Sequence, residues 1–134
     1  MRGLIGKKIG MTQVFNNEGQ SVPVTVIEAG PCVVTQVKTQ KNDGYEAIQV
    51  GYGVRKTKHS NKALDGHFKK ANTDAKRFLA EFVPVPDYDY KTGQKFSVSL
   101  FKEGEYVDVS GSTKGRGFSG VMKRHGFGGG PKTH

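Results

Sequence analysis

The sequence predicts a mainly β protein with a short helical insertion and a long irregular extension. Short runs of alternating apolar residues recur roughly every 8–12 residues, separated by turns that contain glycine, proline or asparagine. A helical spacing of apolar residues interrupts these runs between residues 61 and 82. After residue 110 no regular spacing continues, and eight of the last 24 residues are glycine.

The first expected element is a β-hairpin. A strand at residues 11–15 precedes the turn Asn-Asn-Glu-Gly at 16–19, which is typical of a hairpin. Val22, Val24 and Val26 alternate in the following strand. We therefore expect these three valines to form one apolar face that points inward.

Two further strands are expected at residues 32–39 and 45–50. Gly30-Pro31 breaks the chain before the first, and an Asn-Asp-Gly turn at 42–44 separates the two. Strands of this length and spacing are typical of a small barrel or sandwich. Cys32, the single cysteine of the sequence, excludes an internal disulfide and a multi-cysteine zinc site. Because it lies in an apolar run, we expect a buried and inert thiol.

The insertion, at about 55–82, is predicted to be helical. Leu64, Phe68 and Ala71 lie at positions i, i+4 and i+7, which places them in one apolar stripe and leaves the neighbouring lysines outside it. Thr73 is a suitable N-cap for a second helical turn over residues 76–79.

Two last strands are expected at residues 96–100 and 106–110, on either side of a Glu103-Gly104 turn. A chain of 134 residues has room for one compact domain, or for a small domain with an appendage. We therefore expect a β domain at residues 1–110 and an extended loop at residues 111–134.

The positive charge is concentrated in two blocks. The chain has a net charge of +9. Residues 51–77 carry eight Lys/Arg against two acids, and residues 111–134 carry five Lys/Arg and no acid. A merely solvated surface usually interleaves the two signs. The pattern therefore predicts two contact surfaces for a polyanion, with nucleic acid first and anionic membrane or acidic protein next.

The sequence gives no sign of export or of membrane insertion. No apolar stretch approaches the roughly 20 residues that span a bilayer. The first eight residues lack an apolar region long enough for a signal peptide. We expect a cytoplasmic protein without a membrane partner.

The glycine-rich basic segment 111–127 is the strongest functional feature. Glycines let a backbone approach a phosphate chain closely, while Lys and Arg neutralise its charge. Phe118, His125 and Phe127 offer rings that can stack on unpaired bases. The alternative is a flexible surface loop whose positive charge is incidental.

Two motif matches in this segment carry little weight. Residues 115–120 satisfy G-x-G-x-x-G, but no long helix is expected after them, and residues 111–134 contain no acid to bind a ribose. Arg116-Gly117-Phe118 begins like the RNP1 motif of RNA-binding domains, yet Gly120 stands in the place of its stacking aromatic.

Catalytic and metal-binding patterns are weak. The four histidines, at 59, 67, 125 and 134, lie near basic residues instead of near acids that would make them general bases. Asp87 and Asp89 flank Tyr88 in an acidic turn that is better explained by solvation than by cation binding. His67 is either an RNA contact or a helix-surface residue. We expect no catalytic residues, no metal, no cofactor and no small-molecule substrate.

The sequence resembles the universal family of large-subunit ribosomal protein number three. The family signature, which is an aromatic or Leu, an acid or Asn, a small residue, Ser/Thr, Gly-basic-Gly, Gly and Arg at fixed spacing, is matched without departures. Residues 3–12, 24–32 and 66–70 also look like segments of bacterial members. The signature positions are Phe101, Asp108, Gly111, Thr113, Gly115, Arg116, Gly117, Gly120 and Arg124.

The resemblance implies a small closed β-barrel of the translation-protein type, with a helical insertion and a long finger that penetrates the large-subunit rRNA. It implies early assembly, a position near the peptidyl-transferase region, and ribosomal proteins fourteen and nineteen as neighbours. The protein is not expected to form a homo-oligomer. Family members continue beyond this point, so we expect the chain to be truncated within the finger, of which residues 111–134 form the base.

Charge pattern and resemblance together predict the RNA-binding residues. They are Lys7, Lys8, Arg55, Lys56, Lys58, Lys62, His67, Lys69, Lys70, Lys114, Gly115, Arg116, Gly117, Lys123, Arg124, His125, Phe127 and Lys132. Two other classes stay open at this point. One is a non-ribosomal nucleic-acid chaperone or chromatin-like binder, and the other is a nucleotide-binding enzyme that uses residues 115–120.

Overall fold

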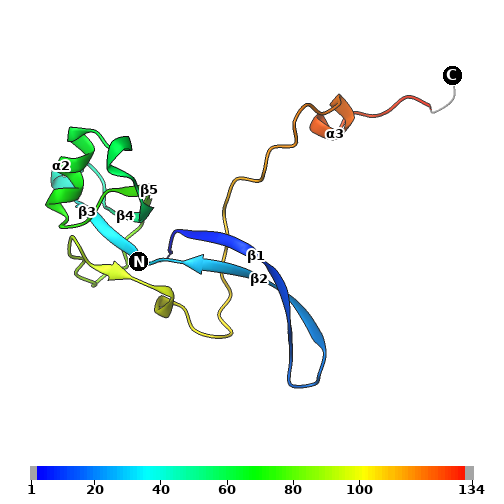
Figure 1. Ribbon diagram of the computed structural model, residues 1–134, viewed down its shortest axis with the longest axis horizontal. Helices are drawn as coiled ribbons and strands as arrows, with labels where there is room; N and C mark the ends of the chain where they lie inside the picture. Colours follow the sequence, from blue (N-terminus) through cyan, green and yellow to red (C-terminus); the bar gives the residue numbers. More distant parts are fainter. Residues whose placement is uncertain (1–2, 132–134) are drawn as a thin grey trace. The chain divides into compact units, whose positions relative to one another are not determined.

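The computed structural model describes residues 3–131 and is mainly β (Figure 1). The chain divides into two compact units between Glu103 and Gly104. In the described residues the strands form two separate antiparallel sheets, and no closed barrel is found. The expected mainly β class is confirmed.

The first sheet is the hairpin of β1 (Gly6–Phe15) and β2 (Ser21–Ala29). Asn16 organises the turn, because its side-chain oxygen accepts hydrogen bonds from the backbone N–H groups of Glu18 (3.1 Å) and Gln20 (2.8 Å). The predicted hairpin is confirmed, and both strands are longer than expected.

The prediction that the hairpin valines form an apolar face pointing inward is not confirmed. Val22 and Val26 are each 40% exposed, and Val24 is half-buried. Within the described residues β1 and β2 pair with each other alone. Strict alternation therefore marked the strand correctly, but it could not supply the second layer that buries an apolar face.

The second sheet has four strands in the order β5–β4–β3–β6, all antiparallel. Their bounds are Cys32–Lys38 for β3, Ala47–Val54 for β4, Lys76–Phe82 for β5 and Lys95–Phe96 for β6. The two strands expected at 32–39 and 45–50 correspond to β3 and β4, so this central pair is confirmed.

The connection between β3 and β4 is short. A helical turn, α1 (Gln40–Asp43), ends at Gly44, which has φ 80°. A residue with a side chain is strained in that conformation, so glycine suits the position where the chain reverses. The expected Asn-Asp-Gly turn lies here.

The core is built on the central strand pair. Cys32, Val34, Ile48 and Val50 are completely buried and share one cluster with Tyr52. Tyr90 is also a member of this cluster, and further apolar side chains pack against it: Leu4, Ile5, Val37, Phe82 and Phe96. The burial expected for the thiol at position 32 is confirmed, and this burial raises the pKa of Cys32 above its ordinary value.

Helix α2 (Lys62–Lys70) contacts β3. Phe68 and Ala71 are each 2% exposed, and Leu64 is half-buried, so the predicted apolar stripe faces the sheet. A 3₁₀ turn, η1 (Thr57–His59), precedes the helix. The helical insertion is therefore confirmed over part of its expected range.

The second helical turn expected at 76–79 is wrong. These residues begin β5, which pairs with β4 from Ile48↔Phe82 to Val54↔Lys76. The free edge of β4 supplies backbone partners that an isolated turn lacks. Pairing with a neighbouring strand has therefore overridden the local capping signal.

The strands expected at 96–100 and 106–110 are also corrected. The first is reduced to β6 and continues as a 3₁₀ turn, η2 (Val98–Leu100). Residues 106–110 have no regular structure, and Tyr106 is fully exposed. Alternation did not become a strand there, because a strand also needs a neighbour to satisfy its N–H and C=O groups.

The second unit contains one helix, α3 (Val121–His125), within the described residues. The rest of residues 104–131 has no regular structure, which agrees with the expectation for residues 111–131, although the five-residue helix was not predicted. No helix of the described chain is long and apolar enough to cross a bilayer.

Phe68→Ala should lower the free energy of unfolding by about 3–5 kcal/mol, because it empties a site that is 2% exposed. Lys69→Ala and Lys70→Ala alter exposed neighbours on the same helix and should leave stability nearly unchanged. Urea denaturation of the three variants measures the difference. A Phe68→Ala loss below 1 kcal/mol would contradict the anchoring role of the ring.

Candidate nucleic-acid interface

Helix α2 begins at a side-chain cap and ends in a basic turn. The side-chain oxygen of Asn61 accepts a hydrogen bond of 2.8 Å from Leu64 N–H. Asp65 lies in the first turn and is bonded by the Ser60 hydroxyl. Basic residues in the last turn, His67, Lys69 and Lys70, favour the negative end of the helix dipole.

Most of the predicted basic residues around α2 are accessible. Arg55 and His67 are half-buried. The exposed predicted residues are Lys56, Lys58, Lys62, Lys69 and Lys70. These side chains come from the segment before the helix and from both of its ends, and together they are called the basic surface around α2 below.

Arg55 has a structural partner as well as a charge. Its Nε donates a 2.8 Å hydrogen bond to the carbonyl oxygen of His59, which closes the turn η1. Its backbone N–H donates to Ala75 O at 2.9 Å. Arg55 therefore holds the connection next to α2, and its guanidinium group is oriented by that turn.

His67 is held by a side-chain network on the sheet. His67 Nε2 lies 2.8 Å from Gln49 Oε1, and the Thr35 hydroxyl lies 2.9 Å from the same oxygen. Thr35 is 3% exposed and stands at the bulge in the β3–β4 register. The amide oxygen of Gln49 therefore fixes the ring so that Nε2 is the nitrogen that donates.

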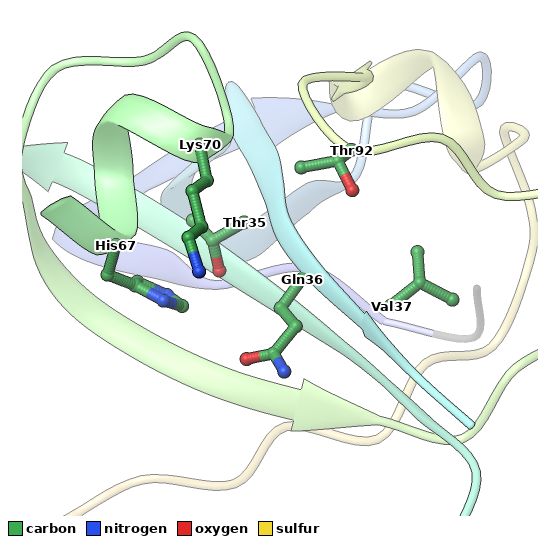
Figure 2. A pocket seen from close by; sticks show the side chains of 6 residues that line it. All are labelled: Thr35, Gln36, Val37, His67, Lys70 and Thr92. Carbon is green, nitrogen blue, oxygen red and sulfur yellow. The ribbon is translucent and has the colours of Figure 1, made fainter. Parts of the chain in front are cut away.

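A polar hollow lies beside this network. Figure 2 shows the Lys70 side chain extending from α2 toward β3, with His67 beside it. An ammonium group next to hydroxyl and amide donors suits an oxyanion such as phosphate. The lining residues are Thr35, Gln36, Val37, His67, Lys70 and Thr92.

Of these lining residues, sequence reasoning identified His67 and Lys70. Thr35, Gln36 and Thr92 were missed, and so was Gln49 of the neighbouring network, because their proximity depends on the bulge between Val34 and Gln36 and on the docking of α2. No local motif signals either feature.

Lys38 is excluded from the free cations of this face. Its ammonium group lies 2.8 Å from Glu81 Oε1, and Tyr45 donates 2.8 Å to the other oxygen of the carboxylate. Hydrogen bonding to Lys38, then to Tyr45, lowers the pKa of Glu81, and the pKa of Lys38 is raised in return. This ion pair joins β3 to β5 across the sheet.

Lys7 and Lys8 lie on β1, and both are exposed. The register of the hairpin shifts between Lys8 and Gly10, which marks a bulge next to the two lysines. They belong to the first unit but to the other sheet, so they are a separate patch from the basic surface around α2.

The extension presents its predicted residues to solvent. In residues 104–131 every residue is exposed except Ser119, and the ring of Phe118 is fully exposed. No ion pair is formed by the cations of this part of the described chain. The exposed predicted residues are Lys114, Gly115, Arg116, Gly117, Lys123, Arg124, His125 and Phe127.

Helix α3 gathers three of these basic residues within five positions. Lys123, Arg124 and His125 form its last turn, and Gly126, with φ 70°, ends it by donating 3.0 Å to Met122 O. The rings of His125 and Phe127 stand edge to face, 6.1 Å apart. This short element therefore presents cations and rings together.

The G-x-G-x-x-G match at residues 115–120 lacks the strand and the long helix that a dinucleotide-binding motif requires. No strand leads directly into Gly115, since residues 97–114 contain none, and the helix after Gly120 has five residues. Within residues 3–131 no group of three His, Cys, Asp or Glu side chains is placed to hold a metal ion. Lys132, the remaining predicted contact, lies outside the described residues.

Comparison with known proteins gives consistent results. The family model described as ribosomal protein L3 matches residues 88–134. The protein "Large ribosomal subunit protein uL3" of Brachyspira pilosicoli is 52% identical over all 134 residues. The protein of the same name from Lysinibacillus sphaericus (strain C3-41) is 55% identical over 133 residues. The chain spans 62% and 64% of the lengths of these two relatives.

Glu81→Gln should remove part of the acid sensitivity of folding. The pKa of Glu81 is lowered in the folded protein, so its ion pair stabilises the fold above the ordinary carboxyl value of 4.5. That contribution is lost as the pH falls through the lower, folded pKa. The wild type should therefore exceed the variant in stability near pH 7, and the difference should shrink toward pH 3 in urea unfolding experiments.

Asp89→Asn is the matched control for this prediction. The Asp89–Lys91 pair is 4.0 Å long, and the two side chains are 86% and 80% exposed. Such a pair contributes little. If both variants differ from the wild type in unfolding free energy by the same amount at pH 7, and both differences shrink equally toward pH 3, the role assigned to Glu81 is contradicted.

Backbone amides of residues 111–131 should exchange with solvent at close to unprotected rates in the free protein. Ordering this glycine-rich segment costs about 1–2 kcal/mol per residue, and its exposed apolar side chains return little of that. Hydrogen exchange read by mass spectrometry measures the rates, with Val34, Ile48 and Val50 as the protected internal reference. Strong protection of the segment in the free protein would show a self-contained fold there.

Proposed function

We propose that this chain, which belongs to the ribosomal protein L3 family, is a structural constituent of the large ribosomal subunit and binds large-subunit rRNA directly. The observation that carries the proposal is the extension at residues 111–131. It has no acidic residue, it is exposed almost throughout, and its cations have no carboxylate partner within the described chain. Phosphates are the partners that such a segment fits.

The basic surface around α2 supports a second contact. Its lysines are exposed, while Phe68 holds the helix against the sheet. Cations presented on a rigid element bind phosphates with a smaller entropy loss than cations on a free chain. We therefore assign the docking of the domain to this surface and the deeper penetration of rRNA to the extension.

The family resemblance supports three finer elements of the proposal. The protein helps to nucleate early assembly of the subunit, and it supports the architecture around the peptidyl-transferase region. Ribosomal proteins fourteen and nineteen are its neighbours. The setting is the cytoplasmic large ribosomal subunit, and the role is structural, without a reaction to catalyse.

We also propose that the β domain belongs to a closed barrel of the translation-protein type. Ile9 and Met11 of β1 are 66% and 65% exposed, which is unusual for two large apolar side chains that lie two positions apart on one strand. Covering strands would bury them. The curated relatives are longer than this chain, so they contain further segments that can supply such strands.

Binding to large-subunit rRNA should be strongly salt-dependent, and the extension should account for much of the dependence. Each neutralised phosphate adds roughly 0.7–0.9 to the slope of log affinity against log salt. Replacing Lys114, Arg116, Lys123 and Arg124 together by Ala should therefore reduce the slope by about 3. Filter binding over a salt series measures it.

The matched control exchanges Lys for Arg and Arg for Lys at the same four positions, which keeps every charge and should keep the slope. An unchanged slope in the Ala variant would remove the extension from the contacts. Competition with unrelated duplex DNA separates the ribosomal protein from a general nucleic-acid chaperone, since the latter should lose its rRNA to the DNA. Cosedimentation with large subunits after a high-salt wash tests the assembled state.

A further inference from the structure

We propose that a groove at the C-terminal end of α2, lined by Lys69, Lys76 and Lys95, binds two adjacent phosphates of an RNA backbone. The inference rests on the proposed function and adds two residues to it, because neither Lys76 nor Lys95 is among the contacts expected from sequence. The groove, of about 450 Å³, is distinct from the hollow of Figure 2, which lies on the other flank of the helix.

The floor of the groove is formed by residues paired with one another across three neighbouring strands. Val33 on β3 pairs with Gly51 on β4 and with Lys95 on β6. Residues directly opposite one another in antiparallel strands point to the same face. Val33 is 4% exposed, so the Lys95 side chain lies next to a buried apolar residue that forms the floor of the groove.

Gly51 places the second lysine. A Cβ at position 51 would lie 2.6 Å from Lys76 Cγ and 2.9 Å from Lys76 Cβ. The aliphatic stem of Lys76 therefore occupies the space that a side chain on β4 would fill. Lys76 is half-buried through this stem, as is usual when a lysine covers apolar surface and keeps its ammonium group in water.

The third side of the groove is the end of α2. Asn72 adopts a left-handed conformation with φ 48°, and Thr73 N–H donates 3.2 Å to Phe68 O. These residues turn the chain from α2 toward β5. The turn brings Lys69, Asn72 and Thr73 to the edge of the groove, with amide and hydroxyl groups beside the ammonium group.

The charge of the groove is unbalanced. Three lysines line it and Asp74 is the one acid among the lining residues. Within residues 3–131 none of the three lysines forms an ion pair with a carboxylate. Three ammonium groups around one hollow repel each other, and two phosphate charges in addition to the Asp74 carboxylate would neutralise them.

An RNA backbone is favoured over a free phosphate by the surroundings of the groove. Phe68 and Ala71 are buried under the helix, and on the opposite flank His67 and Lys70 line the hollow of Figure 2. Cations thus lie on both sides of α2. A continuous strand can contact both flanks, whereas a small anion fills one.

The test compares two variants that lose equal charge. Lys76→Gln/Lys95→Gln removes two lysines of the groove, and Lys41→Gln/Lys91→Gln removes two exposed lysines outside it. In rRNA binding over a salt series, the groove variant should lower the slope by about 1.5 and the control should leave it unchanged. An equal fall in both, or no fall in the groove variant, would overturn the groove as a phosphate site.

A second measurement separates this inference from the proposed function. Titration of the free protein with inorganic pyrophosphate, followed by NMR, should shift the signals of Lys69, Thr73 and Lys95 first, and the shifts should vanish in the groove variant. Specific rRNA binding by the wild type without those shifts and without a slope change in the groove variant would overturn the groove alone. Pyrophosphate shifts without any preference for rRNA would overturn the proposed function and support a site for free phosphates.

Gly51→Ala tests the placement of Lys76 without removing a charge. The added methyl group must displace the lysine stem, so pyrophosphate binding should weaken severalfold while the net charge is constant. Thermal unfolding of the variant checks that the sheet is retained. A folded Gly51→Ala protein with unchanged pyrophosphate affinity would remove Lys76 from the site.

Discussion

Burial of the β3–β4 pair on both faces is the constraint on which the rest of the structure depends. One face carries the cluster of Cys32, Val34, Ile48 and Val50, all completely buried. The other face accepts α2. Because both faces of this strand pair are covered, charged side chains lie at the edges of the unit. The lysines are carried there by α2 and by the ends of β5 and β6. The apolar core thus determines where cations can gather, although it contributes none of them.

The sequence predicted those features that depend on local pattern. The hairpin, the central strands, the stripe of α2 and the irregular extension all follow from spacing over a few residues. It was wrong at residues 76–79 and 106–110, where the outcome depends on whether a neighbouring strand is present. The same limit applies to the site. Clusters of like charge were visible in the sequence, whereas Gln49 and Lys95 required the strand register.

The two proposed contact surfaces use different physics. The surface around α2 is held in place before binding, because Phe68 and the Gln49–His67 hydrogen bond position it. Residues 104–131 make few hydrogen bonds among themselves and keep almost every side chain in solvent. The first surface offers orientation at little entropic cost, and the second offers reach. The proposed contact with rRNA would use both.

The exposed hairpin has a consequence for the free protein. Ile9, Met11 and Phe15 are at least 65% exposed on a two-stranded ribbon, and in the described chain each of its strands has one partner and one open edge. Open edges with apolar side chains are templates for pairing between molecules. Self-association then rises with the concentration of unassembled chains. The covering strands proposed above would occupy these edges, so closing the fold would also keep separate molecules from pairing.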